Sequence, residues 1–456
     1  MEYLIRFSQS HETFRLPEIQ ALAELGGIDL KVLYYDPESP YCIVQLPAEE
    51  AARFLMSRSI LAQSIHEHWG TGDNYEELHE DVKRRTSHLW SKYMQCSFKF
   101  SLDIFQGTRS NTNRREIMNS FAYLAFAGEI KMTNPDEEFI IFEHWDFQAV
   151  TRKLPAPLKV HFGRFIAKSV RDLIMTFDLK KRGYISTTSM DSELALISAN
   201  MALAGPGKVF YDPFVGTGSF PVACAKFGAL ALGSDIDGRS IRGESEKKSL
   251  KGNFKQYGLE HLMGEMFASD LTHTPIRKAR ILDGIICDPP YGVREGLKVL
   301  GVRDPIKYGY VIEKGKEFYK NDDFVPPKKP YSFNAMLDDI LQFATDRLVD
   351  NGRLSFWMPT ANDADQAIDV PTHPCMAIVS VCVQVFNKWS RRLITYRRLP
   401  DSEIDTDALA QRQERVQANG VTADELNDFR RHYFNAFRTD SAVDQAPDDA
   451  TPKISA

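Results

Sequence analysis

Residues 212–220 read DPFVGTGSF, residues 230–237 read LALGSDID and residues 285–292 read IICDPPYG. In each stretch an apolar run lies next to an aspartate, and the first also carries Gly216 and Gly218. Acids that follow successive strands of an open α/β sheet face the same ligand crevice. The spacing therefore predicts a site in which a small cofactor with two hydroxyl groups meets a planar amine.

The first stretch predicts a strand, a glycine turn and a helix in that order. Residues 208–211 are strand-like, the two glycines interrupt the run, and Ser219 opens an alanine-bearing helical segment. Glycine lets the backbone approach a ligand closely. The third glycine of the GxGxxG dinucleotide fingerprint is missing and the loop is shorter, so a pyrophosphate is the weaker expectation.

Two further aspartates are candidates for holding the cofactor. Asp235 ends the second apolar run, where doubly wound folds place an acid against ribose hydroxyls. Asp270 follows the run at residues 266–268, where a third strand would present a carboxylate to an adenine amino group. Aspartate also starts turns and caps helices, so a structural role is the alternative for both.

The turn Asp288-Pro289-Pro290-Tyr291 is the candidate for the chemistry. Its prolines fix the backbone and supply no N–H donors, so the turn presents a carboxylate, carbonyl groups and an aromatic ring together. The carboxylate and a proline carbonyl would accept the hydrogens of a flat NH2 group, while Tyr291 stacks on its ring. A proline turn with a packed tyrosine is the structural alternative, and the glycine turn upstream counts against it.

The combination of DPFVGTGSF and DPPYG resembles the S-adenosylmethionine-dependent amino-methyltransferases. Residues 187–191 (TTSMD), 161–164 (HFGR) and 288–295 (DPPYGVRE) narrow the resemblance to the eukaryotic tRNA guanine-10 N2-methyltransferase catalytic subunits, a THUMP-domain family. The resemblance extends from the N-terminus to about residue 399. It implies a Rossmann-like class I methyltransferase domain of the α/β class, preceded by an α+β region that is ferredoxin-like plus THUMP.

The resemblance further implies S-adenosyl-L-methionine as cofactor and N2 of guanosine 10 in tRNA as methyl acceptor. It places the TTSMD stretch against the methionine end of the cofactor. The cofactor-binding residues that we expect are Thr188, Ser189, Asp212, Phe214, Gly216, Gly218, Asp235 and Asp270. Members of this family work with a small zinc-binding activator subunit. The sequence has no zinc motif of its own, so the zinc of such a heterodimer would belong to the partner.

The mechanism that we expect is direct methyl transfer. Guanine N2 is a weak nucleophile because its lone pair is delocalised into the ring, so the enzyme must orient it and stabilise the charge that develops on nitrogen. Asp288 is expected to perform the second task. The target base must be turned out of its stack, with Tyr291 and Phe214 as the stacking surface.

The periodicity predicts six parts along the chain. They are a ferredoxin-like domain (residues 1–85), a second small α/β domain (86–150), a basic linker helix (151–182), a larger α/β domain (183–400), a helical extension (401–438) and a disordered acidic tail (439–456). The family resemblance implies that residues 86–150 are a THUMP-like RNA-binding domain and residues 183–400 the methyltransferase domain. His66 and His68 flank Glu67 without a third ligand nearby, which predicts a solvated polar surface rather than a metal site. The polar stretch between residues 295 and 331 is expected to be a lid or an RNA clamp.

The formal net charge of −6 is unusual for a protein that binds a polyanion. Residues 152–182, however, are rich in Lys and Arg and contain only two acids, Asp172 and Asp178. Residues 162–177 have helical spacing, so this stretch is either an RNA-contacting helix or an exposed linker helix. The RNA-contacting residues that we expect are Arg109, Arg114, Arg115, Lys180, Lys181 and Arg182.

The composition, with 43% hydrophobic and 26% charged residues, is typical of globular domains. The six cysteines show neither a CxxC pair nor metal-ligand spacing, which favours a reduced compartment. No apolar signal core begins the chain, and no apolar run reaches the roughly 18 residues of a membrane span. We therefore expect a cytoplasmic or nuclear protein that contacts no membrane.

Two other functions stay open at this stage. The DPPY turn also suits adenine N6 in DNA or RNA, although an RNA-binding N-terminal half argues against DNA. A non-catalytic RNA-binding subunit is the other possibility. The intact Gly216, Gly218, Asp288 and Tyr291 count against it.

Overall fold

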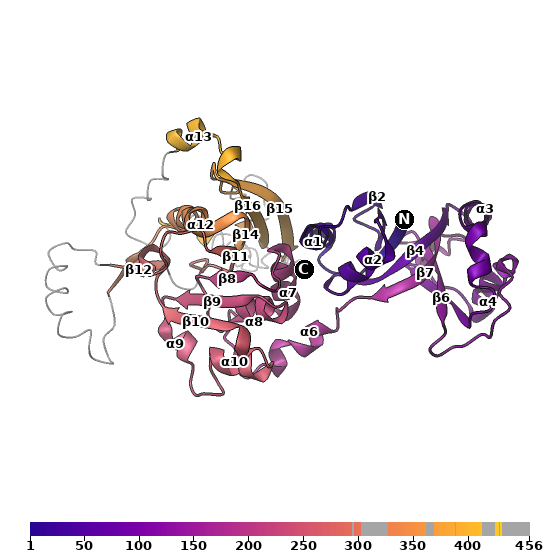
Figure 1. Cartoon of the computed structure of the whole chain (residues 1–456), viewed down its shortest axis with the longest axis horizontal. Coiled ribbons are helices and arrows are strands. Elements are labelled where there is room, and N and C mark those ends of the chain that lie inside the picture. The colour runs from indigo at the N-terminus through magenta and orange to yellow at the C-terminus, as the bar shows by residue number, and fades with distance from the viewer. Residues whose placement is uncertain are drawn as a thin grey trace, which may run out of the picture. The chain divides into compact units, whose positions relative to one another are not determined.

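The computed structural model describes residues 1–293, 296–301, 327–361, 369–387, 389–412, 425–427 and 429–430. The chain forms two compact units, Met1–Thr176 and Phe177–Ala456 (Figure 1). Most of the stretch expected to act as a lid, most of the helical extension and the whole acidic tail lie outside the described residues.

The first unit is built on a seven-stranded sheet with the order β2-β3-β1-β4-β7-β6-β5. Its strands are β1 (Glu2–Phe7), β2 (Lys31–Tyr35), β3 (Tyr41–Gln45), β4 (Ala62–Gly72), β5 (Phe98–Phe105), β6 (Glu137–His144) and β7 (Lys159–Lys168). Its longer helices are α1 (Glu12–Leu25), α2 (Glu49–Met56), α3 (Tyr75–Thr86) and α4 (Asn111–Asn119). The expected ferredoxin-like and THUMP-like parts share this sheet, and we keep the boundary near residue 85 as a proposal.

The basic linker helix expected over residues 162–177 is wrong. Strand β7 occupies most of this stretch and pairs antiparallel with both β4 and β6. Val160 and Phe162 are fully buried, as the two-residue period of a strand requires. At Gly163 a Cβ would come within 2.8 Å of the Glu67 carbonyl oxygen, so the close strand approach excludes a side chain. Only the short helix α6 (Leu173–Thr176) remains.

The solvated surface expected at His66 and His68 is also wrong. Both lie in the central strand β4 and are at most 5% exposed. His66 is paired with the Ser64 hydroxyl at 2.8 Å, and His68 with the Glu2 carboxylate at 3.3 Å. Burial lowers the pKa of both imidazoles, so they are neutral at physiological pH.

The second unit is an open seven-stranded sheet with the order β10-β9-β8-β11-β14-β16-β15. Its strands are β8 (Val209–Asp212), β9 (Leu230–Asp235), β10 (Met263–Ala268), β11 (Leu282–Cys287), β14 (Leu348–Ala361), β15 (Met376–Val385) and β16 (Trp389–Arg398). Neighbouring strands are parallel from β10 to β14, and β16 runs antiparallel to both β14 and β15. This is the expected Rossmann-like methyltransferase sheet with its antiparallel end.

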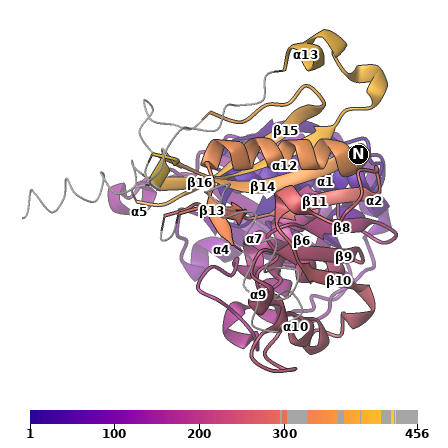
Figure 2. The same ribbon diagram turned by 90° about the vertical axis from the view of Figure 1, so that its left-hand side faces the viewer.

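Helices cover both faces of this sheet. The helix α12 (Phe333–Arg347) lies over one face (Figure 2). It buries Leu337 and Ile340 there in a core shared with Ile285 and Phe356. On the other face the Trp357 indole donates a hydrogen bond of 3.2 Å to the Ser198 hydroxyl on α7 (Ser192–Met201). α8 (Ser219–Lys226) packs beside α7. The central parallel strands β8 and β11 are thus largely buried, as their continuous apolar runs indicate. In the described part of the chain, no helix is long and apolar enough to cross a membrane.

Candidate active site

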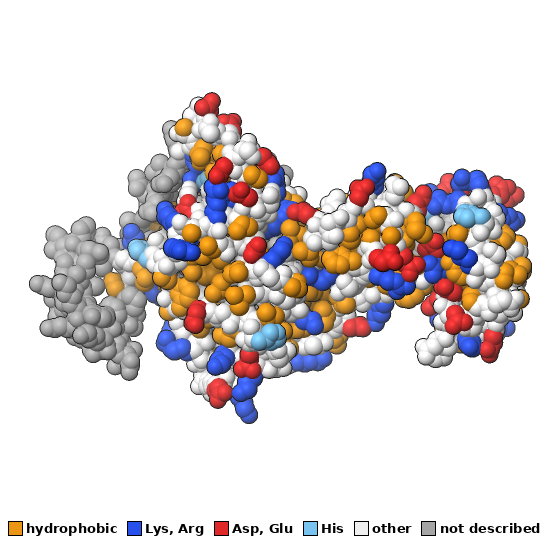
Figure 3. All heavy atoms as spheres, in the orientation of Figure 1, with side chains coloured by type: hydrophobic (Ala, Val, Ile, Leu, Met, Phe, Trp, Pro, Cys, Tyr) orange, Lys and Arg blue, Asp and Glu red, His pale blue; other side chains and the backbone are white. Residues whose placement is uncertain are grey.

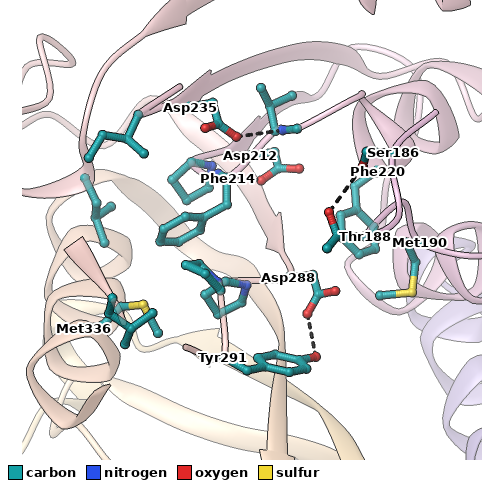
Figure 4. Close-up of a pocket in the computed structure, with 18 of the residues that line it drawn as sticks. Ser186, Thr188, Met190, Asp212, Phe214, Phe220, Asp235, Asp288, Tyr291 and Met336 are labelled. Carbon is teal, nitrogen blue, oxygen red and sulfur yellow. Dashed lines mark hydrogen bonds between the residues drawn. The ribbon is translucent and has the colours of Figure 1, made fainter. Parts of the chain in front are cut away.

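A cavity of about 500 Å³ opens at the carboxyl ends of β8, β9, β10 and β11 in the second unit. All three stretches that predict the fold contribute to its wall (Figure 4). The expected site residues that line it are Thr188, Ser189, Asp212, Phe214, Gly216, Asp235, Asp270, Asp288, Pro289, Pro290 and Tyr291. Residues far apart in sequence therefore share one site, as parallel strand ends require.

Asp235 holds the glycine turn in shape. Its carboxylate accepts hydrogen bonds of 2.9 Å from the backbone N–H groups of Gly216 and Asp237. Burial raises the pKa of Asp235, although these two N–H groups oppose the shift. Gly218 does not line the cavity. It begins α8 with a φ of 87°, a conformation that favours glycine.

Asp212 lies deeper, at 3% exposure, and accepts a hydrogen bond of 2.9 Å from the Phe214 N–H. Burial raises the pKa of Asp212 well above its ordinary value, and the charges of Asp235 and Asp288 add to the shift. Acids that crowd one cavity favour a cationic ligand, which relieves their mutual repulsion.

Asp270 follows β10 and serves the local backbone as well as the cavity wall. It accepts hydrogen bonds from the Thr272 N–H at 2.5 Å and from the Leu300 N–H at 2.7 Å. Burial raises the pKa of this carboxyl, but the hydrogen bonds outweigh burial and leave the pKa below its ordinary value. Asp270 therefore has the structural role that the sequence left open, and it also lines the cavity.

The Asp-Pro-Pro-Tyr turn follows β11. The Tyr291 hydroxyl donates a hydrogen bond of 2.6 Å to Oδ1 of Asp288 (Figure 4). Nη1 of Arg391 lies 4.0 Å from Oδ2 of the same carboxyl. Burial raises the pKa of Asp288 to about 6, while Tyr291 and Arg391 act in the opposite direction. The carboxyl is therefore poised close to neutral pH.

The hydroxyl-rich loop before α7 forms another wall. The Ser189 side chain is hydrogen-bonded to the Thr217 hydroxyl at 2.7 Å, which ties this loop to the glycine turn. The Ser186 and Thr188 hydroxyls are 3.2 Å apart at the cavity wall. These groups suit a polar, hydrogen-bonding part of a ligand.

Sequence reasoning missed several cavity residues. Arg391 comes from β16, Met336 from α12, and Met190 and Phe220 from the elements beside the glycine turn. Arg391 also lies 4.7 Å from the centre of the Trp357 ring. Met190 and Phe220 lie inside the TTSMD and DPFVGTGSF stretches. Nothing in the local sequence signals Arg391 or Met336, because these two residues reach the cavity through the fold.

The expected RNA-contacting residues of the first unit differ in their surroundings. Arg109 forms an ion pair of 2.9 Å with the buried Glu143 and lies 4.7 Å from the centre of the Trp145 ring. Its guanidinium is therefore part of the packing. Arg115 is exposed and Arg114 is partly exposed on α4. On the visible face of the first unit, acidic and basic side chains alternate without a large patch of one sign (Figure 3).

The expectation that Arg182 belongs to an exposed basic stripe is wrong. It is 6% exposed, and its Nη1 donates a hydrogen bond of 3.0 Å to the Ser219 hydroxyl. The neighbouring Lys180 and Lys181, in contrast, are exposed. Arg182 is buried because its side chain packs against the start of α8 and the ring of Tyr257.

A Rossmann-like sheet with its glycine turn, acidic strand ends and Asp-Pro-Pro-Tyr turn around one cavity defines a methyltransferase. Residues 1–171 match the family described as Tmrp11 THUMP N-terminal domain, and residues 180–299 the RMKL-like methyltransferase domain. The chain is 42% identical to the Saccharomyces cerevisiae tRNA (guanine(10)-N(2))-methyltransferase over 87% of its own length and 92% of the yeast protein. It is 33% identical to human tRNA (guanine(10)-N(2))-methyltransferase TRMT11, over 95% of each chain. The chain therefore belongs to the tRNA (guanine(10)-N(2))-methyltransferase family.

Proposed function

We propose that this chain transfers a methyl group from S-adenosyl-L-methionine to N2 of guanosine 10 in tRNA, as the catalytic subunit of a two-subunit enzyme. The observation that carries the proposal is the Asp288 carboxyl, placed by a rigid proline turn at the same cavity as the glycine turn and Asp235. The names of the curated relatives supply the nucleotide and its position.

The residues present fit the proposed cofactor. Carboxylates at Asp235 and Asp270 are suitable acceptors for ribose hydroxyls and an amino group, and the hydroxyls of Thr188 and Ser189 suit the amino-acid end. The ring of Phe214 adds an apolar surface. When bound, S-adenosyl-L-methionine would supply an electrophilic methyl group. The acids around the cavity favour its positive charge.

Asp288 would orient the acceptor amine. An ionised carboxylate accepts an N–H from the exocyclic amine and stabilises the positive charge that develops on nitrogen. Pro289 and Pro290 keep the backbone in place and leave their carbonyl oxygens available. Tyr291 keeps the carboxyl in position through its hydroxyl, and its ring would also contact the base.

The first unit would bind the tRNA through its THUMP region, for which residues 86–150 remain our proposed bounds. The proposed phosphate contacts are Arg114 and Arg115 in this unit and Lys180 and Lys181 at the start of the second unit, supported by their full or partial exposure. We remove Arg109 and Arg182 from that set because both side chains are engaged within the protein.

The proposed second subunit is a small zinc-binding activator that docks on the second unit. Strand β10 supports this proposal, because it is an edge strand and pairs with β9 alone among the described strands. It carries Met263, Met266 and Phe267 and no lysine, and the exposed Glu265 is its single charged residue, so it has little of the charge that protects an edge from strand addition. We expect the chain alone to be poorly soluble and nearly inactive. Full activity of the isolated, monomeric chain would contradict this.

A cytoplasmic location is part of the proposal. It is supported by the six cysteines, none of which is in a disulfide and five of which are buried. Imaging of a tagged chain would test it, and an exclusively nuclear signal would contradict it.

The experiment that tests the proposed reaction uses the full chain co-expressed with the activator. The matched substrates are two tRNA transcripts that carry guanosine or inosine at position 10, because inosine lacks only the 2-amino group. We expect methylation of the guanosine transcript alone, with the product nucleoside identified by mass spectrometry. Equal methylation of both transcripts would show that N2 of this nucleotide is not the acceptor.

A further inference from the structure

The catalytic turn is held by a segment from the far end of the chain. The described residues 425–427 and 429–430 lie against residues 291–293, and we refer to Leu426, Asn427, Phe429 and Arg430 as the C-terminal strap. Leu426, Asn427 and Phe429 are buried. A segment more than 130 residues away in the sequence is thus packed against the turn that carries Asp288.

The strap satisfies carbonyl groups that the turn itself leaves open. The Asn427 side chain donates a hydrogen bond of 2.7 Å to the Tyr291 carbonyl, and Arg430 Nη1 donates one of 2.7 Å to the Gly292 carbonyl. Arg430 also donates to the Val293 carbonyl. Buried carbonyl groups need such partners, and the prolines of the turn offer no N–H.

The strap is fixed at its own end as well. The side-chain oxygen Oδ1 of Asn427 accepts the Arg430 backbone N–H at 3.0 Å, so the side-chain amide is orientated with its NH2 towards Tyr291. The Leu426 carbonyl accepts the Phe333 N–H at 3.0 Å, in the first turn of α12. α12 also places Met336 at the cavity. One segment therefore connects two walls of the site.

The fit leaves little free space. Gly292 has a φ of 71°, and a Cβ there would come within 2.7 Å of Asn427 Nδ2. The Phe429 and Trp389 rings contact the Tyr291 ring edge-on, with centroids 6.5 Å and 6.2 Å away. Tyr291 is thus held by its backbone and by its ring, which leaves its hydroxyl directed at Asp288.

We propose that the C-terminal strap is a positioning element of the active site, in which Asn427 and Arg430 hold the Asp-Pro-Pro-Tyr turn in the geometry needed for methyl transfer. The proposal rests on the function proposed above. A displacement of about 1 Å at a reacting group costs up to about a hundredfold in rate. Loss of the strap contacts should therefore lower kcat and leave binding largely unchanged.

The first test is Asn427→Leu in the full chain with its activator. This substitution keeps the branched shape of the side chain at a somewhat larger volume, and it removes both the NH2 donor and the Oδ1 acceptor. We expect kcat to fall about tenfold or more, with cofactor Kd and tRNA KM changed by less than about twofold. The matched control is Asp407→Asn on the exposed helix α13 (Thr406–Gln411), which should retain wild-type kcat.

The second test uses the less buried Arg430 and does not depend on whether the Asn427 variant folds. Arg430→Met keeps the length of the side chain without its donors, and Arg430→Lys retains a donor. We expect kcat to fall in Arg430→Met and to be restored towards the wild-type value in Arg430→Lys.

Wild-type kcat in both Asn427→Leu and Arg430→Met would overturn the strap proposal alone. The strap proposal would also be overturned if cofactor affinity fell as much as kcat and the melting temperatures fell as well, because such results indicate general destabilisation. A wild-type complex that methylates no tRNA would overturn the proposed function and this inference with it.

Discussion

The Tyr291 hydroxyl donates a hydrogen bond of 2.6 Å to the carboxyl of Asp288, so the two ends of the proline turn are joined by their own side chains. Such a bond favours the ionised carboxyl, whereas burial favours the neutral one. The balance leaves the pKa of Asp288 at about 6. This carboxyl is ionised at physiological pH and still close to its titration range.

We expect methyl transfer to depend on pH through Asp288. Below its pKa of about 6 the Asp288 carboxyl gains a proton, which makes it a weaker acceptor for an N–H of the substrate amine. The single-turnover rate should therefore fall up to about tenfold per pH unit below pH 6, and level off above it. Rates measured across this range test the assignment. A flat profile through pH 6 would rule out Asp288 as the titrating group.

Asp288→Ala should lower the rate by about a hundredfold or more, the range for a positioned acid or base. The fold and cofactor binding should stay nearly intact, because the Asp288 side chain lies at the cavity surface, 22% exposed. Titration calorimetry and single-turnover kinetics separate the two quantities. Loss of cofactor affinity with unchanged turnover would remove Asp288 from the catalytic step.

Tyr291→Phe should shift the acid limb of the pH–rate profile to higher pH. The lost hydroxyl is a group that lowers the pKa of Asp288, so without it the carboxyl should titrate above its wild-type value of about 6. The phenylalanine ring preserves the contacts with Trp389 and Phe429. If the acid limb lies at the same pH in Tyr291→Phe and in wild type, this hydrogen bond does not form in the working enzyme.

Much of the second unit is predictable from sequence because its signals are local. The apolar runs before Asp235 and Asp288 are strands β9 and β11, and the helical pattern after residue 333 is α12. The carboxyl ends of parallel strands meet at one edge, which is why the expected acids share a cavity. The arrangement follows from motif and topology together.

The missed features all depend on contacts between distant residues. Strands β4 and β7 carry polar residues with little exposure, such as His66, Glu67 and Arg164, which interrupt the apolar pattern of a strand. Glu67 and Arg164 form an ion pair with each other. Arg391 reaches Asp288 from another strand, and Asn427 reaches Tyr291 from the end of the chain. No periodicity in a single sequence encodes such pairs.

Arg164 should be important for the stability of the first unit. Its guanidinium is 11% exposed and forms ion pairs of 2.8 Å with Glu49 and Glu67 and of 3.1 Å with Glu137. Arg164→Met would leave these carboxylates close together without their cation, at a cost of about 3 kcal/mol in unfolding free energy. The control Lys168→Met, which breaks an exposed pair with Asp172, should cost less than about 0.5 kcal/mol. Equal denaturation midpoints for the two variants would contradict this role.

The neighbouring basic residues Lys180, Lys181 and Arg182 should separate into two classes. Replacing both exposed lysines with alanine should weaken tRNA binding and reduce the slope of log K against log salt by about 0.7 to 0.9 for each lost phosphate contact. Arg182→Ala should leave that slope unchanged and lower stability by about 1–3 kcal/mol, because it removes the buried bond to Ser219. Fluorescence anisotropy at several salt concentrations, with melting temperatures beside it, distinguishes the classes. An unchanged slope in the double lysine variant would mean that these residues are only solvated, and a reduced slope in Arg182→Ala would place its guanidinium on the RNA.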